Sequence, residues 1–139
     1  MLVFVGQYQH SLDDKGRLVL PVKYRREFEN GGHLSPNADG CLSLWTPGEF
    51  MRRSAEYLEL SRQGDPIRRD EARFWASRSI EVEIDRQGRF ALPATSRSFG
   101  RLESEVFIVG NLDHVELWNP DVYAARQDPA EESFKRGGF

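Results

Sequence analysis

The sequence has few of the features that mark secreted or membrane proteins. It contains one cysteine in 139 residues, so no disulfide can form within the chain. No apolar run approaches the roughly 20 residues that cross a bilayer, and the apolar start over residues 1–5 lacks the length and the basic flank of a secretion signal. We therefore expect a cytoplasmic protein with no membrane partner.

Positive charge is not in excess either. The chain has 19 Lys and Arg against 22 Asp and Glu, which gives a formal net charge of -3. Mixed charges together with 39% hydrophobic residues indicate a folded chain with a core rather than a disordered one. A uniformly basic surface for nucleic acid is excluded, so any affinity for DNA must come from local positive clusters.

What the chain does contain is an internal repeat. Residues 13–21 (DDKGRLVLP) return 72 positions later as residues 85–93 (DRQGRFALP), with Asp, Gly, Arg, Leu and Pro in the same places. Downstream, residues 44–47 (LWTP) reappear as residues 117–120 (LWNP), one further residue out of step. A chain that repeats itself is built from repeated structural units, so we expect a pseudo-twofold molecule.

Each copy of the motif predicts a β-hairpin. Residues 17–20 and 81–84 alternate side chains with a period of two, as half-buried strands do. Gly16 and Gly88 stand where a tight connection needs a positive φ, which glycine adopts at no steric cost. The strands before the two turns show the same alternating face: Tyr8, His10 and Leu12 occupy the positions in the first copy that Ile80, Val82 and Ile84 occupy in the second.

Helix starts are marked by a capping residue followed by proline. This pattern occurs three times, at Thr46, Asp65 and Asn119. We expect two helices over residues 47–79 with a break near Asp65, and a short helical turn after residue 129. The packing residues expected on the two middle helices are Phe50, Tyr57, Leu58, Ile67, Phe74 and Trp75.

These elements predict a mainly β protein with helices, of the α+β class. The expected organisation is a first repeat with its following helix over residues 1–64, a linking helix over residues 65–79, a second repeat over residues 80–128 and a C-terminal tail over residues 129–139. Two such repeats leave no room for a third domain.

The repeated motif also carries a family resemblance. Residues 6–25 (GQYQHSLDDKGRLVLPVKYR), with the second Asp-x-x-Gly-Arg copy, closely resemble the MraZ family of bacterial transcriptional regulators, and the resemblance extends over residues 4–134. It implies two AbrB-like swapped-hairpin modules that interlock in one β-barrel. It also implies a nucleoid-associated protein that forms homo-oligomeric rings and binds repeated promoter elements of the division and cell-wall gene cluster, which it represses. Double-stranded DNA is then the partner, with no cofactor and no small-molecule substrate.

The two turns are the candidate DNA-binding site. The major groove of DNA admits a two-stranded β-ribbon, and a guanidinium group pairs well with guanine edges or phosphates. Asp13 and Arg17 flank one turn as Asp85 and Arg89 flank the other, so each pair can hold its guanidinium in a fixed direction. The DNA-binding residues expected are Lys15, Arg17, Arg86 and Arg89, with Asp13, Asp85, Gly16 and Gly88 as support for the site or as turn staples.

Alternatives are open at these turns. The Asp-x-x-x-Arg pairs can simply staple the turns, with or without DNA contact. The two copies also differ, because Asp14 and Lys15 of the first are replaced by Arg86 and Gln87 in the second, so they need not contact DNA equally. For the flanking basic residues an ordinary solvated surface is favoured over direct contact; these are Lys23, Arg25, Arg26 and Arg97.

Catalytic and metal-binding sites are not expected. The sequence lacks a P-loop, a Gly-x-Ser-x-Gly elbow and a dinucleotide-binding fingerprint. Its histidines and cysteine show none of the close spacing of a zinc motif. Cys41 and His114 match each other in the repeat and are expected as buried filler, His10 as a near-core residue and His33 as an exposed residue of a Gly-rich connector.

The main alternative function is a non-catalytic protein-interaction or antitoxin-like barrel. It would use Trp45, Trp118 and the two middle helices to bind a protein. However, both tryptophans recur at the same place in each repeat, which favours core packing. RNA is a weaker alternative, because the turns lack the aromatic residues that stack on unpaired bases.

Overall fold

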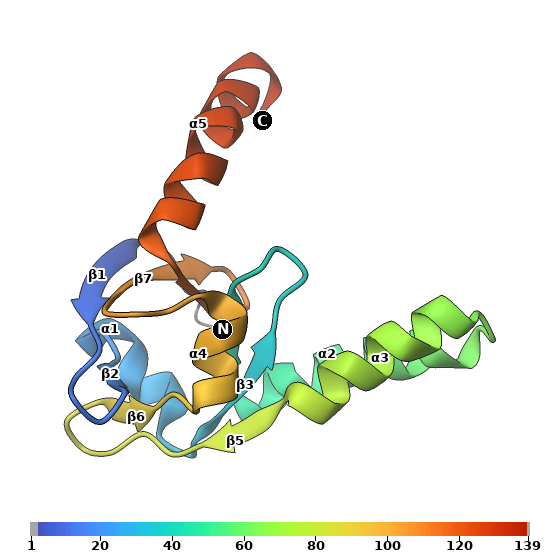
Figure 1. Cartoon of the computed structure of the whole chain (residues 1–139), viewed down its shortest axis with the longest axis horizontal. Helices are drawn as coiled ribbons and strands as arrows, with labels where there is room; N and C mark the ends of the chain where they lie inside the picture. Colours follow the sequence, from blue (N-terminus) through green and yellow to red (C-terminus); the bar gives the residue numbers. More distant parts are fainter. Residues whose placement is uncertain (1–2, 139) are drawn as a thin grey trace.

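The computed structural model describes residues 3–138 and has the α+β architecture that the sequence predicts (Figure 1). Strands and helices alternate in two similar series. The elements are β1 (Gln7–Ser11), β2 (Arg17–Val19), α1 (Val22–Arg25), the short 3-10 helix η1 (Arg26–Phe28), β3 (Gly32–Pro36), β4 (Leu42–Trp45), α2 (Pro47–Arg62), α3 (Pro66–Arg78), β5 (Ile80–Val82), β6 (Arg89–Ala91), α4 (Ala94–Gly100), β7 (Glu105–Asn111), β8 (His114–Trp118) and α5 (Pro120–Gly137).

The strands form two antiparallel sheets that exchange strands between the halves. The large sheet has the order β1-β7-β8-β4-β3-β5, and the small sheet pairs β2 with β6. In the large sheet β1 of the first half pairs with β7 of the second, and β5 of the second half pairs with β3 of the first. This exchange is the swapped-hairpin arrangement, so the tandem fold expected from the repeat is confirmed. The division into four segments along the chain stays a prediction.

The strand registers place equivalent residues of the two halves opposite one another. In the small sheet Leu18 pairs with Phe90, its counterpart in the second copy. In the large sheet Ser43 of β4 pairs with Glu116 of β8, again its counterpart. A local twofold axis therefore passes through both pairs, and this axis relates the two Asp-x-x-x-Arg turns.

The core lies between the two sheets. Leu18 and Phe90, which point inward from the small sheet, are 0% and 2% exposed, and Leu44 and Leu117 of the large sheet are both 0% exposed. All four belong to one apolar cluster. Since each fully buried side chain of this size stabilises a fold by about 1.5–3 kcal/mol, the core holds the small sheet, and with it both turns, on the large sheet.

Two helices form an arm that projects from the sheets. Thr46 caps α2 by accepting from the backbone amide of Glu49 at 3.4 Å, and Asp65 caps α3 by accepting from that of Ile67 at 2.9 Å. The predicted break near Asp65 is thereby confirmed. Figure 1 shows α2 and α3 side by side, extending away from the sheets, and they are neighbours in the structure.

The arm explains an error in the sequence-based prediction of packing residues. Trp75 is buried, and Phe50 and Tyr57 stack on it with ring centroids 5.1 and 4.4 Å away, as expected. The prediction is wrong for the three others, because the arm extends beyond the sheets and only its root is covered. Leu58, Ile67 and Phe74 are 52%, 69% and 41% exposed.

The C-terminal helix α5 is longer than the short turn predicted after residue 129. It begins at Pro120, where the Asn119 side chain accepts from the amides of Asp121 and Val122, and it runs through Pro129 to Gly137. A proline inside a helix removes one hydrogen bond. The helix surface around Pro129 is exposed, so water can satisfy the freed carbonyl. Among the described residues, none of the helices is long and apolar enough to cross a membrane.

Candidate nucleic-acid interface

The first turn is held by the side chain and backbone of Asp13. Its backbone amide donates to the carbonyl of Arg17 at 3.0 Å, and its own carbonyl accepts from Gly16 at 2.9 Å. The carboxylate Oδ1 accepts from the amides of Lys15 and Arg17 at 2.9 and 2.8 Å. Gly16 has φ 73°, a region that side chains other than glycine rarely adopt. The motif therefore folds largely through bonds within five consecutive residues.

The second turn repeats this geometry. The amide of Asp85 donates to Arg89 at 3.0 Å and its carbonyl accepts from Gly88 at 2.9 Å. Oδ1 of Asp85 accepts from the amides of Gln87 and Arg89, both at 2.9 Å. Gly88 has φ 81°. The glycine positions expected from the sequence are thus confirmed in both copies.

Both arginines are fixed by the aspartate of their own turn. Nε of Arg17 donates to Oδ2 of Asp13 at 2.7 Å, and Nε of Arg89 donates to Oδ2 of Asp85 at 2.8 Å. Within residues 3–138 no other hydrogen bond involves these two guanidinium groups, so their Nη groups are available to a ligand. The Arg17 and Arg89 side chains are 33% and 37% exposed.

The aspartates stay ionised. The backbone amide of Arg17, together with its guanidinium, holds the pKa of Asp13 below its ordinary value. The backbone amide and guanidinium of Arg89 do the same for the pKa of Asp85. Each turn therefore offers a charged guanidinium in a fixed direction. In the structure each aspartate bonds the arginine of its own turn, while DNA contact stays a prediction.

The other basic residues near the turns fall into two groups. Lys15 and Arg86 lie exposed at the tips, and Lys23 and Arg26 are exposed as expected for a solvated surface. Arg25 and Arg97 are different. They are half-buried, and their guanidinium groups lie against Gly88 and Gly16, the turn glycines of the opposite half. For these two the prediction of an ordinary solvated face is wrong, because the swapped halves bring them onto the turns.

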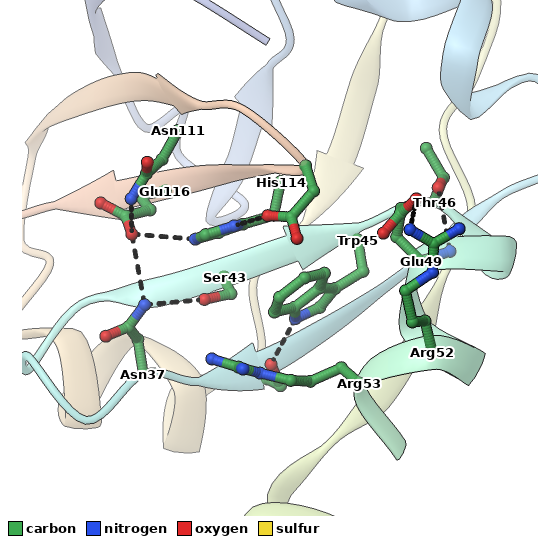
Figure 2. A network of polar contacts seen from close by, with 12 residues as sticks. Asn37, Ser43, Trp45, Thr46, Glu49, Arg52, Arg53, Asn111, His114 and Glu116 are labelled. Carbon is green, nitrogen blue, oxygen red and sulfur yellow. Dashed lines mark hydrogen bonds and ion pairs between the residues drawn. The ribbon is translucent and has the colours of Figure 1, made fainter. Parts of the chain in front are cut away.

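The opposite end of the twofold axis carries a buried polar network (Figure 2). The carboxylate of Glu116, which is 6% exposed, lies 2.9 Å from Nε2 of His114. It accepts from Nε1 of Trp118 at 2.9 Å. It also accepts from the side-chain amides of Asn37 at 3.3 Å and Asn111 at 3.0 Å. The sequence-based prediction missed this network. The available signal was that a carboxylate occupies the place of Ser43 in the other copy.

His114 is more than the filler predicted from the repeat. It is buried, but its ring nitrogens lie 2.8 Å from Asp113 Oδ1 and 2.9 Å from Glu116 Oε2, and its ring stacks on Trp45 at 4.5 Å. Burial alone would lower the pKa of His114, but the hydrogen bonds to the two carboxylates outweigh it and raise that pKa. Burial alone would raise the pKa of Glu116, but the hydrogen bonds from His114, Asn111 and Trp118 lower it.

The remaining candidates for chemistry are structural. Cys41 is fully buried as expected, and burial raises the pKa of its thiol. Trp45 and Trp118 are buried as predicted. His33 is not in an exposed connector: it lies in β3 and stacks on Phe50 at 4.0 Å, because the Gly-rich segment forms a strand. Across residues 3–138 no group of three or more His, Cys, Asp or Glu side chains could hold a metal ion.

Comparison with known families matches both halves of the chain. The family model for the MraZ protein, described as antitoxin-like, matches residues 3–72 and again residues 76–137. The chain belongs to the MraZ family. The double match agrees with the internal repeat and with the two halves of the fold.

Curated relatives in the MraZ family align over most of this chain. A protein of Thermomicrobium roseum is 36% identical over 126 residues, 91% of this chain and 88% of the relative. A protein of Ligilactobacillus salivarius is 35% identical over 136 residues, 95% of this chain and 92% of the relative. A protein of Mycoplasmoides gallisepticum is 38% identical over 121 residues, 87% of this chain and 84% of the relative. All three are named "Transcriptional regulator MraZ".

Proposed function

We propose that this protein is a sequence-specific DNA-binding transcriptional regulator. The observation that carries the proposal is the pair of identical staples, which hold Arg17 and Arg89 in fixed directions on turns related by one twofold axis. The names of the curated relatives support the regulatory role. The proposed DNA-binding residues are Lys15, Arg17, Arg86 and Arg89, supported by Asp13, Gly16, Asp85 and Gly88.

The small sheet with its two turns would meet the major groove. A two-stranded ribbon fits that groove, and a guanidinium held through Nε keeps its Nη edge for guanine N7 and O6 or for a phosphate. Lys15 and Arg86, exposed at the tips, suit phosphate contacts that position the protein without reading sequence. Because the position of Lys15 in the first copy is occupied by Gln87 in the second, the two turns would bind unequally.

Assembly of several copies would strengthen this binding. A module with few phosphate contacts binds weakly at physiological salt, whereas linked modules on repeated sites gain from a high effective concentration. The exposed apolar side chains Leu58, Ile67 and Phe74 on the arm, and Phe134 on α5, support contacts between copies. The full proposal is a homo-oligomeric ring in the cytoplasm, associated with the nucleoid, that represses the division and cell-wall gene cluster through repeated promoter elements.

Replacing Arg17 with alanine tests the proposal. A mobility-shift titration on duplex DNA from upstream of the protein's own gene should show binding weakened by about 1–3 kcal/mol if Arg17 contacts a base. Arg62→Ala removes an exposed arginine of the arm and serves as the control, with unchanged binding. Circular dichroism and size-exclusion chromatography should match the wild type for both variants. Unchanged DNA binding by Arg17→Ala would refute its role.

A second candidate function is a protein-interaction or antitoxin-like barrel. A cavity of about 460 Å³ between the arm and the connection from β3 to β4 favours it, with Tyr57, Ile67, Phe74, Trp75 and Phe99 among its lining residues. The family description as antitoxin-like points the same way. The two functions differ in what accompanies the purified protein, because bound nucleic acid raises the ratio of absorbance at 260 nm to that at 280 nm and a protein partner does not.

A further inference from the structure

The glycines of the two turns are buried, although the residues beside them at the tips are exposed. A Cβ atom added to Gly16 would overlap Nη1 of Arg97. A Cβ atom added to Gly88 would overlap Nε of Arg25 and lie 2.7 Å from its Cζ. Each turn glycine therefore leaves the space that an arginine of the opposite half fills.

The two arginines occupy equivalent positions in the repeat. Arg25 and Arg97 are separated by the same 72 positions that separate the two motifs. Arg25 follows the first turn and lies on the second, whereas Arg97 follows the second turn and lies on the first. Each arginine thus contacts the half of the fold to which it does not belong in sequence, as the strands of the swapped hairpins do.

Backbone hydrogen bonds reinforce the crossed contact on each side. The amide of Leu20 donates to the carbonyl of Gly88 at 2.7 Å, and the amide of Leu92 donates to the carbonyl of Gly16 at 3.0 Å. Nε of Arg25 in turn donates to the carbonyl of Leu20 at 2.9 Å. Arg25 therefore bonds Leu20, the residue whose own amide bonds the opposite turn, and it packs on that turn at the same time.

We infer that Arg25 and Arg97 are positioning residues of the DNA-binding surface, each clamping the turn of the opposite half. This inference rests on the proposed function. Fixing each turn against the other half sets the separation of Arg17 and Arg89 before DNA arrives, so less conformational freedom is lost on binding. Such preorganisation should increase the ratio of the affinity for target DNA to that for other DNA. In a turn that is not clamped, the guanidinium can be displaced and lose its contact with the base.

The test separates positioning from direct phosphate contact. The probes are a duplex from upstream of the protein's own gene and a shuffled duplex of equal length, with binding followed by fluorescence anisotropy at several salt concentrations. Arg25→Ala and Arg97→Ala should each reduce the ratio of the two affinities by about tenfold, the discrimination of roughly one base pair. The slope of log affinity against log salt should not change. Arg26→Ala, which removes a neighbouring exposed arginine, should leave the ratio unchanged.

A change in the slope of log affinity against log salt would contradict the positioning role. Loss of a direct phosphate contact makes this negative slope shallower by about 0.9, so a shallower slope in Arg25→Ala would show that Arg25 contacts DNA directly and would overturn the positioning role. An unchanged affinity ratio in both variants would overturn it as well. Arg25→Lys keeps the charge but lacks the Nε donor to Leu20, so it should behave like Arg25→Ala; full rescue by lysine would again indicate a charge contact.

Hydrogen exchange without DNA tests the crossed geometry directly. Arg25→Ala should speed exchange of the Gly88 amide and leave that of Gly16 unchanged, and Arg97→Ala should do the reverse. Equal effects at both turns would overturn the crossed clamp, because they would reflect general loosening. If the wild type binds neither duplex, the proposed function fails and the DNA role of the clamp fails with it. If the wild type binds the upstream duplex more tightly than the shuffled one, the results for the variants test only the positioning role of Arg25 and Arg97.

Discussion

Replacing Glu116 with leucine should destabilise the protein strongly. Its carboxylate is buried and interacts with His114 while accepting hydrogen bonds from Asn37, Asn111 and Trp118. Leucine is of similar size but accepts no hydrogen bond. Removing one partner of a buried ion pair costs about 3–5 kcal/mol. The two asparagines are not buried, so their side-chain amides can form hydrogen bonds with water instead. We therefore expect the total loss in the free energy of unfolding to stay within about 3–5 kcal/mol.

The measurement is urea unfolding at fixed protein concentration, followed by tryptophan fluorescence at neutral pH. Glu103→Leu makes the same chemical change at an exposed position and should shift the free energy of unfolding by less than about 0.5 kcal/mol. His114→Phe keeps a ring to stack on Trp45 and removes the charged partner. The double variant His114→Phe/Glu116→Leu should lose less than the sum of the single losses, because neither charge is then left unpaired.

Two results would refute this reasoning about the network. A loss below about 1 kcal/mol for Glu116→Leu would mean that the carboxylate is worth no more than an exposed ion pair. Strict additivity in the double variant would mean that His114 and Glu116 stabilise the fold independently, in spite of the 2.9 Å between them.

The remaining predictions concern pH and salt. The pKa of His114 is raised above its ordinary 6.5 in the folded protein, so its protonated form stabilises the fold fully below that pH, and this contribution is lost as the pH rises through the raised pKa. Urea unfolding from about pH 5 to about pH 9 should therefore show the stability advantage of the wild type over His114→Phe shrinking as pH rises; a growing advantage would contradict the charged pair. Affinity for the upstream duplex should fall linearly on a log-log plot with salt, with a slope of about -0.9 per phosphate contact, and Lys15→Ala should make that slope shallower. A flat salt titration would point to a ligand other than DNA.

The turns were predictable because they are local. Asp13, Gly16 and Arg17 interact through bonds that span four positions or fewer, and the second copy repeats every bond. The cap at Asp65 is local in the same way, since its side chain accepts from an amide two residues on. Patterns of this kind depend only on residues that are neighbours in the chain, so they can be predicted from the sequence.

The errors concern contacts between distant residues. The exposure of Ile67 and Phe74 depends on the direction in which the arm leaves the sheets, and an amphipathic pattern does not contain that direction. The network around Glu116 needs β4 and β8 side by side, which a strand pattern alone does not specify. The extent of α5 is an exception, because it depends on a local feature: Pro129 removes one hydrogen bond, but the exposed helix continues through it to Gly137.

The sequence by itself determined the twofold repeat, the two stapled turns and the arginines that they hold, since these follow from spacing, glycine conformation and short-range hydrogen bonds. The tertiary structure alone decided that the halves exchange strands, that a buried carboxylate lies on the axis at Ser43, and that Arg25 and Arg97 cross onto the opposite turns. The physical reason is that packing brings together groups far apart in the chain, and the closeness of two such groups is set by the whole fold rather than by either segment.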